Sequence, residues 1–277
     1  MSQVQLAISQ VCTLPWPLEE DLRQMAQAAC PAVELWWGKV ETYLQHHTVA
    51  ELAELLRRHE LAAPVASYQG GFFTRDARAF QEHWAHFLRR LQLAQALGVQ
   101  VLVLAADADQ PVEGEQVEQF LGRLQQAAEQ AQRWGLRVAL EFQARSTFGN
   151  NLQTAAAVVE QLNHPALGIC LDALHFFTGP SKTEDLAYLR PENLFHVQLC
   201  DVAGPVRELA RDADRILPGE GDFPIGELVA QLQQLGYQGT VSLEVMNPHL
   251  WQVPVLQLAE VGMTALRRLW GEACMPD

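Results

Sequence analysis

Short runs of β-branched and aliphatic residues alternate with longer amphipathic stretches along the whole chain. The short runs have the length of strands, and the longer ones have the periodicity of helices. We expect strands at 4–9, 32–37, 61–67, 99–105, 136–142, 166–172, 193–200 and 239–245, and helices at 18–29, 48–59, 76–97, 113–134, 150–163, 182–190, 224–235 and 253–270. This pattern predicts an α/β fold, a single (β/α)8 TIM barrel formed as one domain over residues 1–277.

The later strands alternate large apolar residues with small or polar ones. In strand 136–142, Val138, Leu140 and Phe142 share one face, and Ala139 and Glu141 share the other. An open doubly wound sheet is buried on both faces and would show continuous apolar runs instead. The alternation favours a barrel whose large residues pack outward on the helices while the other set lines the interior. The same rule predicts that Phe195, Val197 and Leu199 face outward.

Four inward-facing polar residues lie at or near the C-terminal ends of consecutive strands: Glu141, Asp172, Gln198 and Glu244. Barrel active sites form at that end. Three carboxylates in a partly dry pocket would repel one another unless a cation lay between them, which predicts one bound divalent metal ion. Oxygen ligands favour Mn²⁺ or Mg²⁺, with Co²⁺ or Zn²⁺ left open. The alternative is ordinary polar groups capped by backbone or water.

Four further residues are candidates for substrate binding, each with a plainer alternative. His175 either supports a carboxylate ligand, contacts a substrate hydroxyl or is structural. Arg215, in the long loop 203–224, either clamps an oxygen group of the substrate or is a solvated surface charge. Glu34 either binds a substrate hydroxyl or pairs with Lys39 or backbone, and Trp36 forms either an apolar wall of the pocket or part of an aromatic rim that packs loops together.

The amino-acid composition argues against some classes of binding partner. Lys and Arg number 19 against 33 Asp and Glu, and the net charge of −14 opposes broad contact with nucleic acid. No apolar run is long enough to span a bilayer, and the N-terminus lacks the features of a signal peptide, so we expect a cytoplasmic protein without membrane contact that acts on a small-molecule substrate. A homo-oligomer is left open. The five cysteines, Cys12, Cys30, Cys170, Cys200 and Cys274, are widely spaced and are expected to be reduced thiols.

Five short segments carry a family resemblance: LEFQ, LDALH, HVQLCD, LPGEGDFP and SLEV. Their order and spacing resemble the xylose isomerase-like TIM-barrel superfamily, whose members include sugar isomerases and epimerases, hydroxypyruvate isomerase, inosose-processing enzymes, 3-dehydroshikimate dehydratase and endonuclease IV. The resemblance implies a metal held by the same four residues, Glu141 and Glu244 as the acid/base pair, and substrate contact by His175. Gln198 in place of His is more similar to the hydroxypyruvate isomerase and dehydroshikimate dehydratase branches. The scarcity of suitably placed histidines and the negative charge argue against the endonuclease.

The function expected from these features is a metal-dependent isomerase or epimerase of a small hydroxy-carbonyl compound such as a sugar, a sugar acid or an inosose. A proton would be removed next to the carbonyl, and the metal would stabilise the resulting enediolate. A lyase of the 3-dehydroshikimate dehydratase type is one alternative, because elimination can begin with the same proton removal. A non-catalytic metal-binding barrel is the other alternative, since a fold does not establish a function.

Overall fold

The computed structural model describes residues 4–271, and within them eight strands form a closed parallel barrel. The order around the barrel is β1, β10, β7, β6, β5, β4, β3, β2. The strands span Gln5–Ser9 (β1), Ala32–Trp36 (β2), Ala62–Gln69 (β3), Val101–Ala106 (β4), Arg137–Phe142 (β5), Leu167–Asp172 (β6), Leu194–Leu199 (β7) and Thr240–Leu243 (β10). The predicted (β/α)8 TIM barrel and all eight predicted strands are confirmed. The assignment of residues 1–277 to one domain stays a prediction.

The helices follow the predicted amphipathic stretches except in the segments after β2 and after β6. They span Leu18–Gln27 (α1), Trp37–Tyr43 (α2), Val49–Arg58 (α3), Ala77–Ala96 (α4), Gly114–Arg133 (α5), Leu152–Leu162 (α6), Ala173–Thr178 (α7), Ile225–Leu235 (α8) and Val255–Trp270 (α9). The α-helix expected at 182–190 is wrong, because that region forms a 3₁₀ helix, η2, over Thr183–Tyr188. The sequence analysis missed α2 and α7, each too short to show a periodic apolar face.

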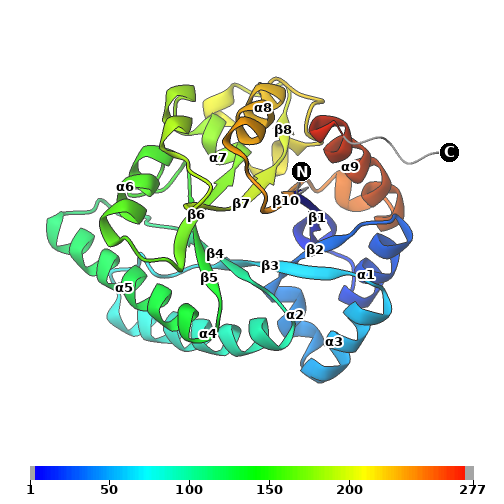
Figure 1. Cartoon of the computed structure of the whole chain (residues 1–277), viewed down its shortest axis with the longest axis horizontal. Coiled ribbons are helices and arrows are strands. Elements are labelled where there is room, and N and C mark those ends of the chain that lie inside the picture. The colour runs from blue at the N-terminus through cyan, green and yellow to red at the C-terminus, as the bar shows by residue number, and fades with distance from the viewer. Residues whose placement is uncertain (1–3, 272–277) are drawn as a thin grey trace. The chain divides into compact units, whose positions relative to one another are not determined.

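Contacts divide the chain into two compact units, one up to Pro64 and from Val197 onward, the other from Val65 to His196. In the first unit, β1 runs parallel to both β10 and β2, and the C-terminal helix α9 packs against β1 and α1 (Figure 1). Gly262 also lets α9 approach β10 closely, because a Cβ atom there would lie 2.5 Å from Leu243 of β10. Segments from both ends of the sequence, β1 and α9, therefore lie in contact in this unit.

In the second unit, β4, β5 and β6 lie side by side, with α5 and α6 packed along them (Figure 1). The prediction for Phe195 is wrong: its side chain packs in one buried cluster with Ala139 and Cys170, on the inward face. Gly168 explains why Phe195 can face inward, because a Cβ atom at position 168 would lie 2.6 Å from the Phe195 ring. The guanidinium of Arg137 lies 4.6 Å from the centre of that ring. The glycine on β6 thus leaves room for the large side chain of Phe195 from β7.

The cysteines agree with the prediction of reduced thiols where they are described. Cys12, Cys30, Cys170 and Cys200 are buried and form no disulfide among the described residues, and Cys274 lies outside those residues. Burial raises the pKa of Cys30 to about 12, because the thiolate would lose its hydration. Among residues 4–271, none of the helices is both long enough and apolar enough for a membrane crossing.

Candidate functional site

The four predicted metal ligands are all buried at the C-terminal ends of their strands or just beyond. Glu141 is the penultimate residue of β5, and Asp172 is the last residue of β6. Gln198 is the penultimate residue of β7, and Glu244 follows β10 directly. The three acidic residues each offer a carboxylate oxygen that could ligate a metal ion. Their exposed fractions are 5% for Glu141, 0% for Asp172 and 6% for Glu244, so each charge is largely removed from water.

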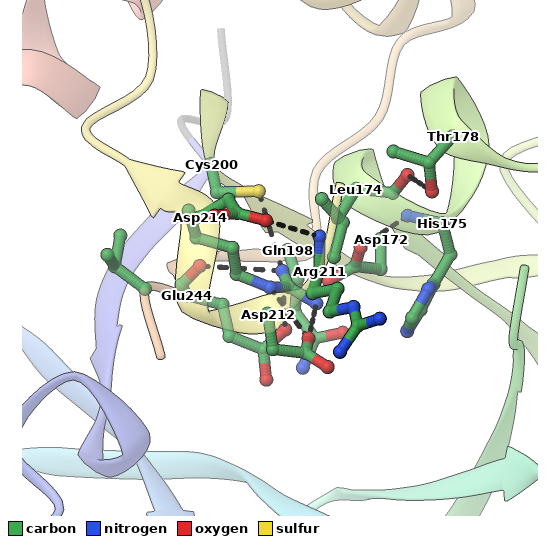
Figure 2. Close-up of polar contacts among 12 residues, drawn as sticks. Asp172, Leu174, His175, Thr178, Gln198, Cys200, Arg211, Asp212, Asp214 and Glu244 are labelled. Carbon is green, nitrogen blue, oxygen red and sulfur yellow. Dashed lines mark hydrogen bonds and ion pairs between the residues drawn. The ribbon is translucent and has the colours of Figure 1, made fainter. Parts of the chain in front are cut away.

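Within the second unit, Asp172, His175 and Glu141 form a connected group. The backbone N–H of His175 donates to Asp172 Oδ1 at 2.9 Å, which caps the N-terminus of α7 (Figure 2). The Nε2 atom of His175 lies 3.7 Å from Glu141 Oε1. The sequence of β6 followed at once by a short helix therefore places the imidazole beside a predicted ligand. Support of a carboxylate, one of the roles predicted for His175, fits this placement.

Within the first unit, Arg215 is buried beside Glu244. Its Nη1 donates to Glu244 Oε2 at 3.4 Å and to Cys200 Sγ at 3.4 Å. Its Nη2 lies 2.9 Å from Asp212 Oδ1. Figure 2 shows these three partners, Cys200, Asp212 and Glu244. Arg215 is only 1% exposed, so the alternative of a solvated surface charge is wrong for this residue.

Glu34 is also buried, and its carboxylate faces Gln198. The Gln198 Nε2 donates to Glu34 Oε1 at 2.9 Å. The alternative partner Lys39 is wrong, because its Nζ donates instead to Asp21 and to the carbonyl and hydroxyl oxygens of Thr13. A predicted ligand and a residue predicted to bind substrate thus contact each other directly.

A buried polar network that the sequence analysis missed fixes the backbone of Trp36. Gln10 joins its two ends, since its Oε1 accepts from the Trp36 N–H at 3.0 Å and its Nε2 donates to Asp21 at 3.3 Å. Lys39 pairs with the same Asp21 carboxylate. Burial raises the pKa of Asp21 and lowers the pKa of Lys39, because both charges have left water. These residues lie on separate segments, so no local sequence pattern could have paired them.

Trp36 and Trp16 line a groove of about 590 Å³ in the first unit. Tyr43 and His47, on the same groove, stack with ring centres 4.2 Å apart. The groove has a volume typical of small-molecule pockets. The predicted wall role of Trp36 is compatible with this position, whereas the neighbouring Trp37 is 1% exposed and belongs to the core.

Cys12 brackets the backbone of Glu244. Its thiol donates to the carbonyl oxygen of Leu243 at 3.4 Å, and its sulfur accepts from the N–H of Val245 at 3.2 Å. Glu244 itself donates its N–H to the Leu199 carbonyl oxygen at 2.9 Å. The backbone that carries this carboxylate is therefore held by contacts from β7 and from the 3₁₀ helix Gln10–Thr13, which follows β1. A lone cysteine after β1 gave no signal of this role in the sequence.

The turn Leu217–Phe223 in the loop after β7 is organised by Asp201, a buried residue that the sequence analysis did not single out. Its side chain accepts from the backbone N–H groups of Gly219 at 3.0 Å and Phe223 at 2.9 Å. A Cβ atom at Gly221 would lie 2.4 Å from Asp201 Oδ1. The Pro-Gly-Glu-Gly turn is thus held by the Asp201 carboxylate.

The fold and these residues can be compared with known proteins. A family model described as "Xylose isomerase-like TIM barrel" matches residues 22–269. The chain belongs to this family. The xylose isomerase-like fold is also found in a crystal structure of the IOLI protein with a bound zinc atom, which superposes with a TM-score of 0.91 at 22% identity and covers 99% of this chain and 100% of that one.

Two curated relatives of this xylose isomerase-like barrel differ in named activity. An inosose isomerase of Bacillus velezensis is 23% identical over 240 residues, which are 85% of this chain and 86% of the relative. A 3-dehydroshikimate dehydratase of Pseudomonas putida is 27% identical over 259 residues, which are 92% of this chain and 40% of the relative. Both similarities extend over most of this chain.

Proposed function

We propose that the chain is a divalent-metal-dependent isomerase or epimerase of small hydroxy-carbonyl compounds. The observation that carries the proposal is a set of three buried carboxylates and one buried amide at the ends of β5, β6, β7 and β10, in a barrel of the xylose isomerase-like family. Its relatives named inosose isomerase support the same class. The substrate class is a sugar, a sugar acid or a cyclic polyol ketone.

The donor set fits a hard divalent cation. Glu141, Asp172, Gln198 and Glu244 offer only oxygen ligands, and three of the four are carboxylates whose burial is costly without a nearby positive charge. The four strands are neighbours in the order of the barrel, and active sites of such barrels form at the C-terminal ends of the strands. We therefore assign the metal to these four residues, with Mn²⁺ or Mg²⁺ favoured. The zinc in the IOLI structure keeps Zn²⁺ among the candidates.

A divalent ion in this position would stabilise negative charge on the substrate's carbonyl oxygen as a proton leaves the neighbouring carbon. In the proposed reaction, one of the two carboxylates Glu141 and Glu244 takes that proton, and the other returns a proton to the adjacent carbon or the opposite face. His175 lies beside Glu141 and Arg215 beside Glu244, so each proposed acid/base has a nitrogen donor next to it. In the proposed reaction, these nitrogen groups help to hold the two carboxylates in place.

A dehydratase is the second candidate function. The similarity to the Pseudomonas putida 3-dehydroshikimate dehydratase extends over 92% of this chain. Proton removal by the same carboxylates would then be followed by loss of a β-hydroxyl group instead of reprotonation. The two candidates differ in product: the dehydratase forms a conjugated product with a new ultraviolet absorbance, whereas the isomerase or epimerase does not.

The test is proton exchange in heavy water with metal-free protein reloaded with Mn²⁺, Mg²⁺, Co²⁺ or Zn²⁺. Inososes, ketoses, hydroxypyruvate and 3-dehydroshikimate are incubated with each form, and deuterium incorporation is followed by NMR. We expect metal-dependent exchange at the carbon next to the carbonyl of at least one compound. Tight metal binding without exchange in any of them would instead support the non-catalytic barrel.

Substitutions of Glu141 and Glu244 test the proposed acid/base roles. Glu141→Gln and Glu244→Gln should each lower exchange by at least about 100-fold, because general acid–base catalysis contributes on the order of 10²–10⁴. Glu208→Gln is the matched control, because Glu208 is an exposed residue of the loop after β7. Exchange at the wild-type rate in either of the first two variants would remove that residue from the proposed role.

A further inference from the structure

The hydrogen bond between Gln198 and Glu34 joins two strands that are not neighbours in the barrel. Gln198 lies on β7 and Glu34 on β2, both within the first unit. Nε2 of the amide donates to Oε1 of the carboxylate at 2.9 Å. The residues are 1% and 0% exposed, so little water competes for this contact. The bond therefore constrains both side chains.

The chemistry of the two groups decides which end of the amide faces Glu34. A carboxylate only accepts hydrogen bonds, and a glutamine amide has one end that donates and one that accepts. Only the NH₂ end of Gln198 can pair with Glu34, so the amide oxygen is directed away from Glu34. A cation binds the oxygen of an amide and is repelled by its NH₂ group, so a rotation of the amide by a half turn would convert a ligand into an obstacle.

We propose that Glu34 is a positioning residue that locks the Gln198 amide with its oxygen available to the metal. The inference rests on the proposed function, since it takes Gln198 as a metal ligand. Glu34 itself does not bind the metal; it acts through the orientation of its neighbour, as partners of metal ligands commonly do. This role accounts for a buried acidic residue on β2 that the proposed reaction does not otherwise use.

Metal affinity gives a readout that does not depend on catalysis. Mn²⁺ is titrated into metal-free protein and the free ion is measured by electron paramagnetic resonance. Glu34→Met keeps the length of the side chain but replaces the carboxylate with a thioether that accepts hydrogen bonds only weakly, and it should weaken Mn²⁺ binding by about 10- to 100-fold. Glu34→Gln keeps an acceptor oxygen but adds an NH₂ donor that can also pair with the Gln198 oxygen, so it should weaken Mn²⁺ binding by less than Glu34→Met does. Equal losses in both variants would indicate that the charge of Glu34 matters, and would overturn the positioning role.

A double-mutant cycle separates an effect through Gln198 from a direct one. In a Gln198→Met background, Glu34→Met should have no further effect on the Mn²⁺ dissociation constant, whereas additive losses would overturn the inference. The double variant should also melt at a higher temperature than Glu34→Met alone, since both partners of the buried hydrogen bond are then apolar. That comparison still tests the pairing if the single variant folds poorly.

Two controls keep the inference apart from the proposed function. Ser9→Ala alters the residue paired with Glu34 in the register of β1 and β2, and should leave Mn²⁺ binding unchanged. Failure of wild-type protein to bind Mn²⁺, Mg²⁺, Co²⁺ or Zn²⁺ would overturn the proposed function itself. Tight binding by wild type with unchanged affinity in Glu34→Met would overturn only the positioning role.

Discussion

The guanidinium of Arg215 lies 3.4 Å from the carboxylate of Glu244, with side-chain exposures of 2% and 7%. The same guanidinium contacts Asp212, which is half exposed. A buried ion pair is strongly destabilised when one partner is removed, because the other charge is left without compensation. The Arg215–Glu244 contact is therefore a test of how the site is held together.

Replacing Arg215 by Met should lower the free energy of unfolding of the metal-free protein by about 3–5 kcal/mol. Arg215→Lys should lower the free energy of unfolding by a smaller amount. Lysine keeps the positive charge, although it cannot make both contacts of the guanidinium. Urea unfolding followed by circular dichroism measures both. Arg207→Met is the control, since Arg207 is an exposed arginine of the same loop. Equal stabilities of the Arg215→Met and control variants would contradict the expectation.

Replacing Cys12 by Ala should lower the free energy of unfolding more than the same change at Cys30. Both thiols are buried, so both substitutions remove one sulfur atom from the core. Of these two thiols, only that of Cys12 forms hydrogen bonds with other described residues, and their loss should add about 1–2 kcal/mol. Thermal or urea unfolding of the two variants gives the difference directly. A larger loss at Cys30 would show that the contacts around Glu244 add nothing.

Asp107 should make the stability of the protein fall as the pH rises. Partial desolvation of the carboxylate raises the pKa of Asp107 above its ordinary value of 3.8, although the residue as a whole is exposed and the carboxylate accepts the Gly71 N–H at 2.7 Å. The folded state then holds this proton more tightly than the unfolded state, so the contribution is complete below pH 3.8 and is lost as the pH rises through the raised pKa. In urea titrations at several pH values, the wild type should lose stability relative to Asp107→Asn across that interval.

The pKa of Asp76 is shifted in the opposite direction to the pKa of Asp107. Backbone N–H groups of Ala79 and Arg78 hold the pKa of this helix cap below its ordinary value. Its contribution is therefore present above the ordinary carboxyl pKa and is lost as the pH falls through the lowered one. Relative to Asp76→Asn, wild type should lose stability towards acid. The same direction of change for both residues would contradict the assignment of partial desolvation as the cause at Asp107.

Much of the fold followed from local patterns. The eight strands and most of the long helices agree with the periodicity of apolar residues, because each element must bury one face wherever it lies. The features that the sequence did not predict correctly are short elements or depend on a residue that is distant in the sequence. The helix α7 is capped by the Asp172 side chain, and η2 takes the place of the expected α-helix at 182–190. Phe195 turns inward because Gly168, on another strand, leaves room for its ring.

In the site, too, local features could be predicted from the sequence and contacts between distant residues could not. Glu141, Asp172, Gln198 and Glu244 could be selected from the sequence, because their positions at strand ends are local properties. Their predicted role as metal ligands still awaits the metal titrations. The partners that orient them could not be selected, since Gln198 and Glu34 are 164 positions apart in the sequence. Nor could any pattern show that Lys39 pairs with Asp21 and leaves Glu34 to Gln198.

The amino-acid sequence by itself determined the class of fold and the chemical types gathered at the strand ends, because periodicity and residue type are carried by the chain locally. Only the tertiary structure decided which buried groups contact each other: Arg215 with Glu244, Glu34 with Gln198, and Cys12 with the backbone around Glu244. The physical reason is that a buried polar group must find its hydrogen-bond partner among whatever residues packing brings within about 3 Å, however distant they are in the sequence.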